Sequence, residues 1–319
     1  MSLHIAYRIL HIVKNTYFCF VSFVVIILLT GCSSQPLYKD TQVMMGTFVE
    51  VTSPDKQAAA IVFNEIKRIE KLLSKYDPQS EISQLNKLGK LKVSPETFFI
   101  LTKSILFYKQ TNGAFDVTVG PLLDVWGFTD KKYILPDKSK IKQAMQFVGS
   151  DKIVLNEVDS VVKFNSPGVE IDLGAIAKGF AGDCAVEKLK GAGVKSCLIN
   201  AGGQIYCLGE RFGKPWKVAI KNPRGQGNAG YLDLVNKAVA TSGDYESYFE
   251  AAGKRYMHIF DPRTGFPAES GAICVTVIAP DGLTADALAT AIMVLGKEKS
   301  DAIVKQYPEV IVKIIDKNE

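Results

Sequence analysis

Apolar and polar residues follow two spacings along the chain after residue 40. Apolar residues recur at helical spacing over Asp55–Lys75, and helices are also expected over residues 96–110, 139–148, 174–190 and 281–296. Alternation predicts a strand over residues 42–53. Strands are also expected over 196–209, 216–223, 271–280 and 310–315, a hairpin over 152–165, and a succession of strand and loop over 234–265. The polar stretch 74–89 predicts a loop. This order favours an α+β fold, with mixed or antiparallel sheets and packed helices, over a strict βαβ succession.

The first 31 residues have the pattern of a secretory signal. Basic residues precede an apolar run from Tyr17 to Leu29, and Leu29-Thr30-Gly31-Cys32 follows. The run is short for a membrane span, which needs about 20 apolar residues. The tetrapeptide is similar to a bacterial lipoprotein cleavage box, with Cys32 as the lipidated residue; the alternative is an uncleaved anchor. We therefore expect a signal peptide at 1–31, a polar tether at 32–40 and one domain at 41–319, lipid-anchored on the extracytoplasmic side of an inner or outer bacterial membrane.

Charge and cysteine spacing exclude two classes of site. The formal net charge is +5 without a long basic run, so no nucleic-acid partner is expected. The four cysteines after Cys32 contain no CxxC pair, which disfavours a cysteine zinc site. Cys197 and Cys207 flank an expected turn and are the best candidates for a disulfide, although small buried apolar residues are the simpler interpretation.

Histidine content restricts metal chemistry further. The chain has three histidines, and two of them, His4 and His11, lie in the expected signal. His258 is then the one imidazole of the mature protein, which excludes sites built from two or three histidines. Any metal must be held mainly by oxygen, as Mg²⁺ and Ca²⁺ are.

Asp286 and Thr290 lie one helical turn apart in the expected helix 281–296. Thr284 is expected to cap this helix, and Asp286 would then lie in the first turn, where the helix dipole favours a carboxylate. Thr290 can bond back to a helix carbonyl. The alternative is functional: a carboxylate and a hydroxyl on one face supply two oxygen ligands for Mg²⁺, which also takes substrate phosphates.

The stretch "IDLGAIAKGFAGD", residues 171–183, leads from a strand into a helix. Such a helix N-terminus can bind an anion, and Lys178 would add a point charge for a phosphate. Alternatively, Asp172 is a cap and Lys178 a solvated surface residue. The GxxxxGK[ST] spacing of a P-loop is absent.

Aromatic residues gather near two carboxylates in residues 113–128. Phe115, Trp126 and Phe128 lie close in sequence to Asp116 and Asp124, and could hold a flat heteroaromatic ring or form core. Tyr76 could stack on such a ring or be an ordinary half-buried tyrosine. Met45, at a strand start, would by itself be assigned to the core.

His258 is the only candidate for a histidine general base, and its alternative is a structural role in a strand. The turn residues of "DPRTG" after it are consistent with a purely architectural segment. Ser242 lacks the GxSxG context of a serine hydrolase, so that class is disfavoured.

Eight of these stretches, taken in order, resemble the ApbE family of FAD:protein FMN transferases. They are "MGTF", "YDPQSEISQLN", "GAFDVTVGPL", "IDLGAIAKGFAGD", "NAGGQIYCLG", "ATSGDYESYF", "HIFDPRTGFP" and "TADALATAIMVLG", from Met45 to Gly296. The resemblance implies a T-fold-like architecture and Mg²⁺ bound by the Ala175 carbonyl, Asp286 and Thr290. The FAD-binding residues that it implies are Met45, Tyr76, Asn86, Ala114, Phe115, Asp116, Asp172, Lys178, His258 and Ile259.

The same resemblance implies the reaction. FMN would pass from FAD to a threonine hydroxyl of an acceptor flavoprotein, and AMP would leave. His258 would be the first choice as catalytic base, and Asp286 or a metal-held hydroxide the second. Acceptors would carry an Asp-Gly-x-Thr type motif and belong to redox complexes. Two alternatives remain open: an FAD pyrophosphatase that releases FMN and AMP, and a non-catalytic periplasmic flavin-binding protein.

Overall fold

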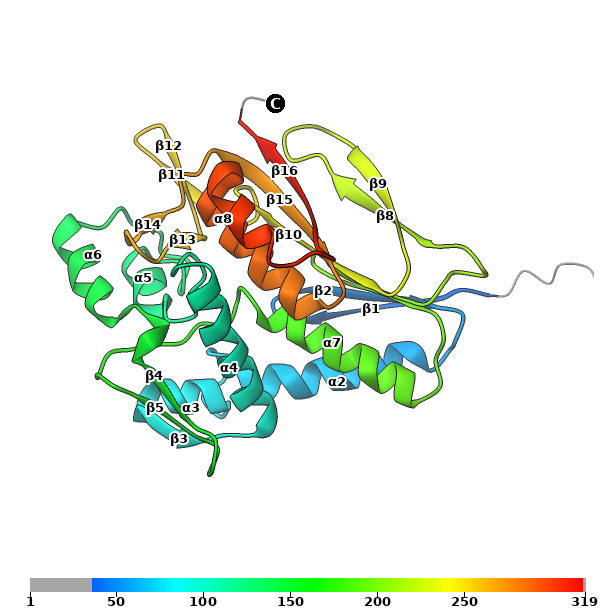
Figure 1. Ribbon diagram of the computed structural model, residues 1–319, viewed down its shortest axis with the longest axis horizontal. Helices are drawn as coiled ribbons and strands as arrows, with labels where there is room; N and C mark the ends of the chain where they lie inside the picture. The colour runs from blue at the N-terminus through cyan, green and yellow to red at the C-terminus, as the bar shows by residue number, and fades with distance from the viewer. Residues whose placement is uncertain (1–35, 318–319) are drawn as a thin grey trace, which may run out of the picture. The chain divides into compact units, whose positions relative to one another are not determined.

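Seven antiparallel strands form the central sheet of the computed structural model, which describes residues 36–317. The order is β1-β2-β6-β7-β10-β15-β16, and every neighbouring pair runs antiparallel (Figure 1). The bounds are β1 (Tyr38–Met44), β2 (Thr47–Ser53), β6 (Cys197–Ala201), β7 (Gln204–Leu208), β10 (Lys237–Gly243), β15 (Ala272–Ala279) and β16 (Ile311–Asp316).

Three long helices cover one face of this sheet: α2 (Ala58–Leu73), α7 (Ala177–Gly191) and α8 (Gly282–Val304). The alternation of apolar and polar residues along each strand determines which face of the sheet these helices cover. In β2, Val49 and Val51 are buried while Phe48 is exposed. β15 is buried at all of its positions, because α8 packs on one face and another hairpin lies on the other. This hairpin, β8 (Trp216–Lys221) with β9 (Asn228–Leu234), forms a second hydrophobic cluster with β7, β10 and β15.

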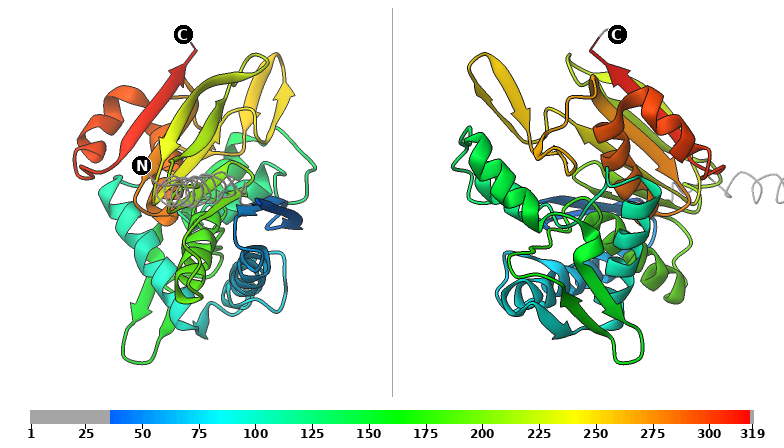
Figure 2. Two further views of the ribbon diagram at one scale, coloured as in Figure 1. Left: turned by 90° about the vertical axis from the view of Figure 1, so that its right-hand side faces the viewer. Right: turned by 60° about the vertical axis from the view of Figure 1, so that its left-hand side comes forward.

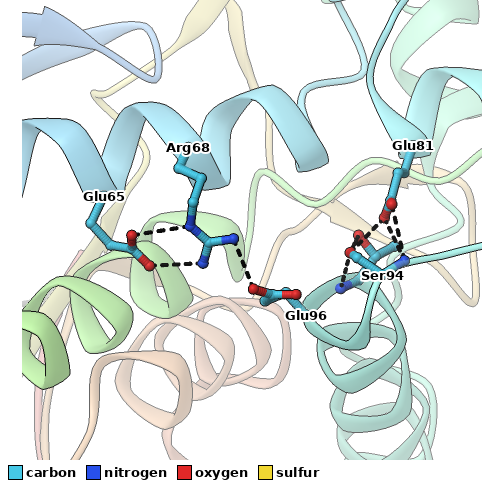
Figure 3. Close-up of polar contacts among 6 residues, drawn as sticks. Glu65, Arg68, Glu81, Ser94 and Glu96 are labelled. Atoms are coloured by element: carbon cyan, nitrogen blue, oxygen red, sulfur yellow. Dashed lines mark hydrogen bonds and ion pairs between the residues drawn. The ribbon is translucent and has the colours of Figure 1, made fainter.

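A smaller group of elements packs beside α2. It contains α3 (Glu81–Leu88), α4 (Pro95–Gln110) and a three-stranded sheet in the order β3-β5-β4, made of β3 (Lys90–Lys92), β4 (Ile153–Asn156) and β5 (Val161–Phe164). Arg68 on α2 bonds Glu65 at 2.8 and 3.0 Å and Glu96 on α4 at 2.8 Å (Figure 3). Ser94 caps α4 and bonds Glu81, so α3 and α4 are also joined.

Aromatic packing attaches the remaining small elements. These are α5 (Gly120–Val125), α6 (Lys138–Ala144), the short 3₁₀ turns Met145–Phe147 and Ser150–Lys152, and the hairpins β11 (Tyr248–Ala251) with β12 (Lys254–Met257) and β13 (Phe260–Asp261) with β14 (Phe266–Pro267). Trp126 is fully buried and lies 5.4–6.4 Å, between ring centroids, from Phe249, Tyr256, Phe260 and Phe266. Trp126 and Phe128 are therefore core residues, the simpler of the two interpretations of that aromatic group.

The expected α+β fold with antiparallel sheets is confirmed, with differences in single elements. The stretch 42–53 is a hairpin that turns at Met45 and Gly46, and β1 begins at Tyr38, inside the expected tether. The loop prediction for 74–89 was wrong for residues 81–88, because Ser80 caps a short helix, α3, which is followed by Gly89 in a left-handed conformation. The helix expected to end at Gly296 continues to Val304 through a non-helical Gly296.

The four cysteines within residues 36–317, Cys184, Cys197, Cys207 and Cys274, are buried or partly buried and free. Cys197 belongs to the main core and Cys207 to the second cluster, so their side chains lie on opposite faces of the sheet. The register explains this, because Cys197 pairs with Leu208 and Leu198 with Cys207. A disulfide between them is thus absent, and the interpretation as buried apolar residues holds.

Two kinds of sequence prediction fall outside the described residues: the signal peptide 1–31 and the lipidated Cys32. Within residues 36–317, no helix has both the length and the apolar character that a membrane crossing requires.

Candidate active site at the junction of α7 and α8

The segment before α7 is held in place by backbone and side-chain bonds. The Asp172 N–H donates to the Val117 carbonyl at 2.7 Å, and the Asp172 carboxylate accepts from the Gly174 N–H at 2.8 Å. The Asn86 amide both donates to and accepts from the backbone of Ile171, at 2.9 and 2.8 Å. Asn86 therefore positions the segment before Asp172, and a direct contact between Asn86 and FAD stays a prediction.

Lys75 is a buried partner of Asp172 that the sequence did not single out. Its side chain is 5% exposed, and its Nζ lies 3.1 Å from Asp172 Oδ2 and 3.5 Å from Glu170 Oε1. Burial lowers the pKa of Lys75, but the two carboxylates outweigh it and raise the pKa above its ordinary value. The Lys75 ammonium fixes Oδ2 of Asp172, and Oδ1 accepts the hydrogen bond from the Gly174 N–H.

Asp286 lies where α7 and α8 contact each other. Its Oδ2 accepts a hydrogen bond from the Gly179 N–H at 2.9 Å, and its side chain is buried. A Cβ on Gly179 would lie 2.4 Å from the Gly282 carbonyl oxygen, so only glycine permits this approach. Burial raises the pKa of Asp286, while the Lys178 ammonium and the Gly179 N–H oppose that rise.

The capping explanation of Asp286 was wrong. Asp281, not Thr284, caps α8, and its side chain accepts from the Thr284 N–H at 2.7 Å. Asp286 consequently lies beyond the first turn of α8, where the unpaired N–H groups of the helix end are no longer available. The helix dipole therefore does not account for the buried position of Asp286 against α7.

Two residues that the sequence did not single out hold the two helices together. The Tyr206 hydroxyl on β7 bonds the carbonyls of Lys178 and Gly179 at 2.8 and 2.7 Å. Its ring fills the space that a Cβ on Gly182 or Gly282 would occupy. Asp183 on α7 accepts from the N–H groups of Gly282 and Leu283 at 2.6 and 2.8 Å. Burial raises the pKa of Asp183 to about 7, and the two N–H groups oppose that rise.

Oxygen donors available to a cation come from three positions. Asp286 uses Oδ2 for Gly179, and no hydrogen bond to its Oδ1 is found within residues 36–317. Thr290 is partly exposed one turn later on α8, and Ala175 lies in the turn that leads into α7. The Gly179 N–H, which would reach the Ala175 carbonyl in a regular helix, donates to Asp286 instead.

No group of three or more His, Cys, Asp and Glu residues gathers in the described part of the chain. A carboxylate, a hydroxyl and a carbonyl nevertheless suit Mg²⁺, which keeps several waters.

His258 follows β12 and is held by one carbonyl. Its backbone N–H and its Nδ1 each lie 3.0 Å from the Ser247 oxygen. A carbonyl only accepts, so Nδ1 carries the proton and Nε2 has a free lone pair. Burial lowers the pKa of His258; the Ser247 bond opposes this, Lys178 lowers the pKa further and Asp172 raises it. The charges of Lys178 and Asp172 therefore both act on this imidazole.

Met45 and Tyr76 differ in exposure and strain. Tyr76 is 69% exposed, and its ring lies 5.5 Å from the Lys75 ammonium. Met45 occupies the first turn position between β1 and β2 with a φ of 48°, and its N–H donates to Glu70 at 2.7 Å. Met45 and Gly46 form the two-residue turn of the β1–β2 hairpin, which needs a positive φ at both positions, and methionine is uncommon in that conformation.

The remaining expected FAD residues are buried. Ala114, Phe115 and Ile259 lie in the main core. Asp116 accepts from Thr118 and Ser150 through both oxygens, and burial raises its pKa against these bonds. The side chains of these four residues contact protein, so the contacts with FAD expected of them remain predictions, available mainly to their backbone atoms.

The chain is similar to proteins of one family. The sequence model of the ApbE family matches residues 45–314. A curated relative, the FAD:protein FMN transferase of Haemophilus influenzae, is 36% identical over 247 residues, which cover 74% of this chain and 71% of that protein. A second, from Klebsiella pneumoniae, is 33% identical over 293 residues, 90% of this chain and 91% of that one. The crystal structure of the ApbE protein from Thermotoga maritima superposes with a TM-score of 0.82 at 34% identity, covering 89% of this chain and 95% of that chain.

Proposed function

Because the chain belongs to the ApbE family, we propose that it transfers the FMN part of FAD to a hydroxyl group of an acceptor protein. The observation that carries this proposal is the convergence at the start of α7. The buried Asp286 accepts a hydrogen bond from the Gly179 N–H at 2.9 Å, beside Lys178, whose charge lowers the pKa of both Asp286 and His258. Three distant parts of the sequence thus supply a candidate base, a cation and a buried carboxylate, a combination suited to phosphoryl-group transfer.

Substrate binding would use surfaces on both sides of this point. Tyr76 offers an exposed ring on which the flavin can stack. The strained turn at Met45 and the backbone of residues 114–116 would border the dinucleotide, together with His258 and Ile259. Lys178 would pair with a phosphate, and Asp172, fixed by Lys75, would bond a polar edge of the nucleotide.

Ala175, Asp286 and Thr290 would hold Mg²⁺ through the Ala175 carbonyl and the two side chains of α8. When bound, the ion neutralises charge on the diphosphate of FAD. The Gly179 N–H orients Asp286 for this purpose and occupies only one of its oxygens.

His258 would accept the proton of the acceptor hydroxyl. Its neutral form is favoured by burial, and its Nε2 has the free lone pair. The threonine oxygen forms a bond to the FMN-side phosphorus as the bond from phosphorus to the bridging oxygen breaks. AMP leaves with that electron pair, and the hydroxyl proton passes to Nε2.

Placement in the cell is part of the proposal. Residues 1–31 would be removed as a signal peptide, and Cys32 would carry lipid that holds domain 41–319 on the extracytoplasmic side of the membrane. Acceptors would be subunits of redox complexes with an Asp-Gly-x-Thr type motif.

One reaction mixture tests the activity. It contains the purified protein without its first 31 residues, FAD, Mg²⁺ and a purified acceptor domain with the motif above. Flavin fluorescence that stays on the acceptor after denaturation, with one AMP per flavin, supports transfer. AMP and free FMN without labelled acceptor indicate an FAD pyrophosphatase. Intact FAD bound to the protein indicates a flavin-binding protein, and either of these results refutes the proposal.

A further inference from the structure

An exposed apolar run lies between α5 and α6. Tyr133 is 37% exposed, Ile134 48% and Leu135 53%, and they are consecutive. We call residues 130–142, which contain this run and most of α6, the lysine-rich segment. Consecutive exposed apolar residues cost solubility, so such a run is typical of a surface that another molecule covers.

The segment is held in one conformation before any partner arrives. The Tyr133 ring stacks on Phe249 with centroids 5.5 Å apart and an interplanar angle of 10°, and it meets Phe128 edge-on. The Ile134 N–H donates to the Trp126 carbonyl at 3.2 Å. Gly127 allows the chain to fold back, since a Cβ there would lie 2.3 Å from the Lys132 carbonyl oxygen. Preorganisation of this kind reduces the entropy lost on binding.

Charge on the segment is strongly positive. It contains five lysines and two aspartates: Lys131, Lys132, Lys138, Lys140, Lys142, Asp130 and Asp137. Lys132 pairs with Asp130, and no ion pair of the other four lysines is found in the described part of the chain. A covering surface should therefore be acidic around an apolar centre.

The segment adjoins the proposed FAD site. Thr129, the residue before it, accepts a hydrogen bond from Lys75 at 3.2 Å, and Lys75 contacts Tyr76 and Asp172. On its other side lies β11–β12, where Tyr248 is 38% exposed and stacks on Arg255 at 4.0 Å. Figure 2 shows α6 and this hairpin on the same side of the domain.

We propose that the lysine-rich segment, with Tyr248 of β11, is the surface on which the acceptor protein docks, through an acidic patch with an apolar centre. This inference rests on the proposed transfer of FMN, because a folded acceptor must bring its hydroxyl to FAD beside Tyr76. An anionic bilayer also offers negative charge around an apolar interior. The position of the lysine-rich segment in the domain, however, fits membrane binding less well than acceptor binding. The proposed anchor at Cys32 precedes Tyr38 by six residues, a reach of at most about 21 Å. Figure 1 places α6 at the far end of the domain from the start of β1.

Substitutions on the exposed run test this docking surface. Ile134→Asp with Leu135→Asp should reduce kcat/KM for a purified Asp-Gly-x-Thr acceptor domain by about 10-fold or more, through KM, because two interface apolar groups are replaced by charge. FAD affinity, measured by flavin fluorescence, should not change. Val158→Asp is the matched control, since Val158 is 97% exposed in the turn between β4 and β5. A triple variant, Lys131→Glu with Lys138→Glu and Lys140→Glu, should raise KM most at low salt.

An unchanged acceptor KM in the double variant overturns the docking surface. So does a result in which the double variant loses binding to vesicles of anionic phospholipid but keeps its acceptor KM. If the wild-type protein binds FAD and transfers no FMN, the proposed function fails. Calorimetric binding of the acceptor domain to wild-type and double-variant protein then still decides the docking surface: equal affinities refute it, and weaker binding by the variant supports it.

Discussion

His258 would carry the proton in the proposed transfer, and its contacts predict how a variant behaves. Among residues 36–317 the imidazole bonds only the Ser247 oxygen, so His258→Ala removes a base but breaks few other contacts. We expect the rate of FMN transfer to fall by about 10²–10⁴-fold while FAD affinity changes little. Single-turnover transfer and flavin fluorescence measure the two quantities separately. An unchanged rate would exclude His258 as the base.

The pH dependence of the rate follows from the same imidazole. Burial lowers its pKa below 6.5, so the neutral, active form persists into mildly acidic solution. Transfer should stay on its plateau as the pH falls to 6.5 and decline only when the pH passes through the lowered pKa. The free energy of unfolding should also decrease as the pH falls below 6.5, because His258 binds a proton at a higher pH in the unfolded chain than in the folded one. A pH–rate profile whose acidic limb has an apparent pKa above 6.5 would contradict this assignment.

Asp286 is expected to determine metal affinity. Asp286→Asn keeps the shape of the side chain but removes the charge, so Mg²⁺ affinity of the FAD complex should fall by about 10-fold or more, equivalent to about 1.4 kcal/mol. Titration calorimetry measures this directly. Asp301→Asn is the control, because Asp301 lies on the same helix and is exposed. Equal Mg²⁺ affinity in the two variants would remove Asp286 from the metal site.

Sequence reasoning placed residues on helices and strands better than it predicted the partners of their side chains. The spacing of Asp286 and Thr290 indicated a shared helix face, and the structure has both on α8. Asn86 and Asp116 were expected to bind FAD, yet their polar atoms bond Ile171, Thr118 and Ser150. The sequence could not show this, since a polar side chain looks the same whether its partner is a ligand or a distant backbone group.

At the scale of elements, the contact between α7 and α8 should respond to a single methyl group. Gly179→Ala places a Cβ 2.4 Å from a backbone oxygen of α8 and should destabilise the protein by about 1–3 kcal/mol. It should also weaken Mg²⁺ binding, because Asp286 bonds Gly179. Gly191→Ala is the control on the same helix: nothing lies within 4 Å of its added Cβ, so helix propensity should stabilise the protein by up to about 1 kcal/mol. Urea unfolding of both variants measures the difference, and equal stabilities would contradict close packing at Gly179.

Long periodic elements were predictable and short or interrupted ones were not. α2 and α4 fall within a few residues of their predicted ranges, because each repeats apolar residues over 16 positions. α3 has only 8 residues, mostly polar, and depends on its cap Ser80 and on Gly89. Gly296 looked like a helix end, but it is a kink that places its α-carbon against Ser270, and α8 continues beyond it.

At the scale of the whole molecule, the candidate site depends on contacts that no local pattern encodes. Lys75, just after α2, meets Asp172, just before α7, where these two helices pack together, and Tyr206 meets Lys178 because β7 lies against α7. Asp183 bonds residues that follow it by 99 and 100 positions. The order of strands is set by the packing of the whole core. For this reason Lys75, Tyr206 and Asp183 became visible only in the structure.

The proposed anchor and the folded domain should be separable. The central sheet begins at Tyr38, and no bond described above requires a residue before Leu37. Cys32→Ser should therefore release the protein from the membrane fraction, because a single acyl-bearing residue would supply the attachment. FAD affinity and FMN transfer to a soluble acceptor domain should match those of the wild type, since the site lies within residues 45–290. Fractionation of cells with immunodetection, followed by assay of both fractions, measures this. A Cys32→Ser protein that stays wholly in the membrane fraction would show that attachment comes from the uncleaved apolar run at 17–29 instead.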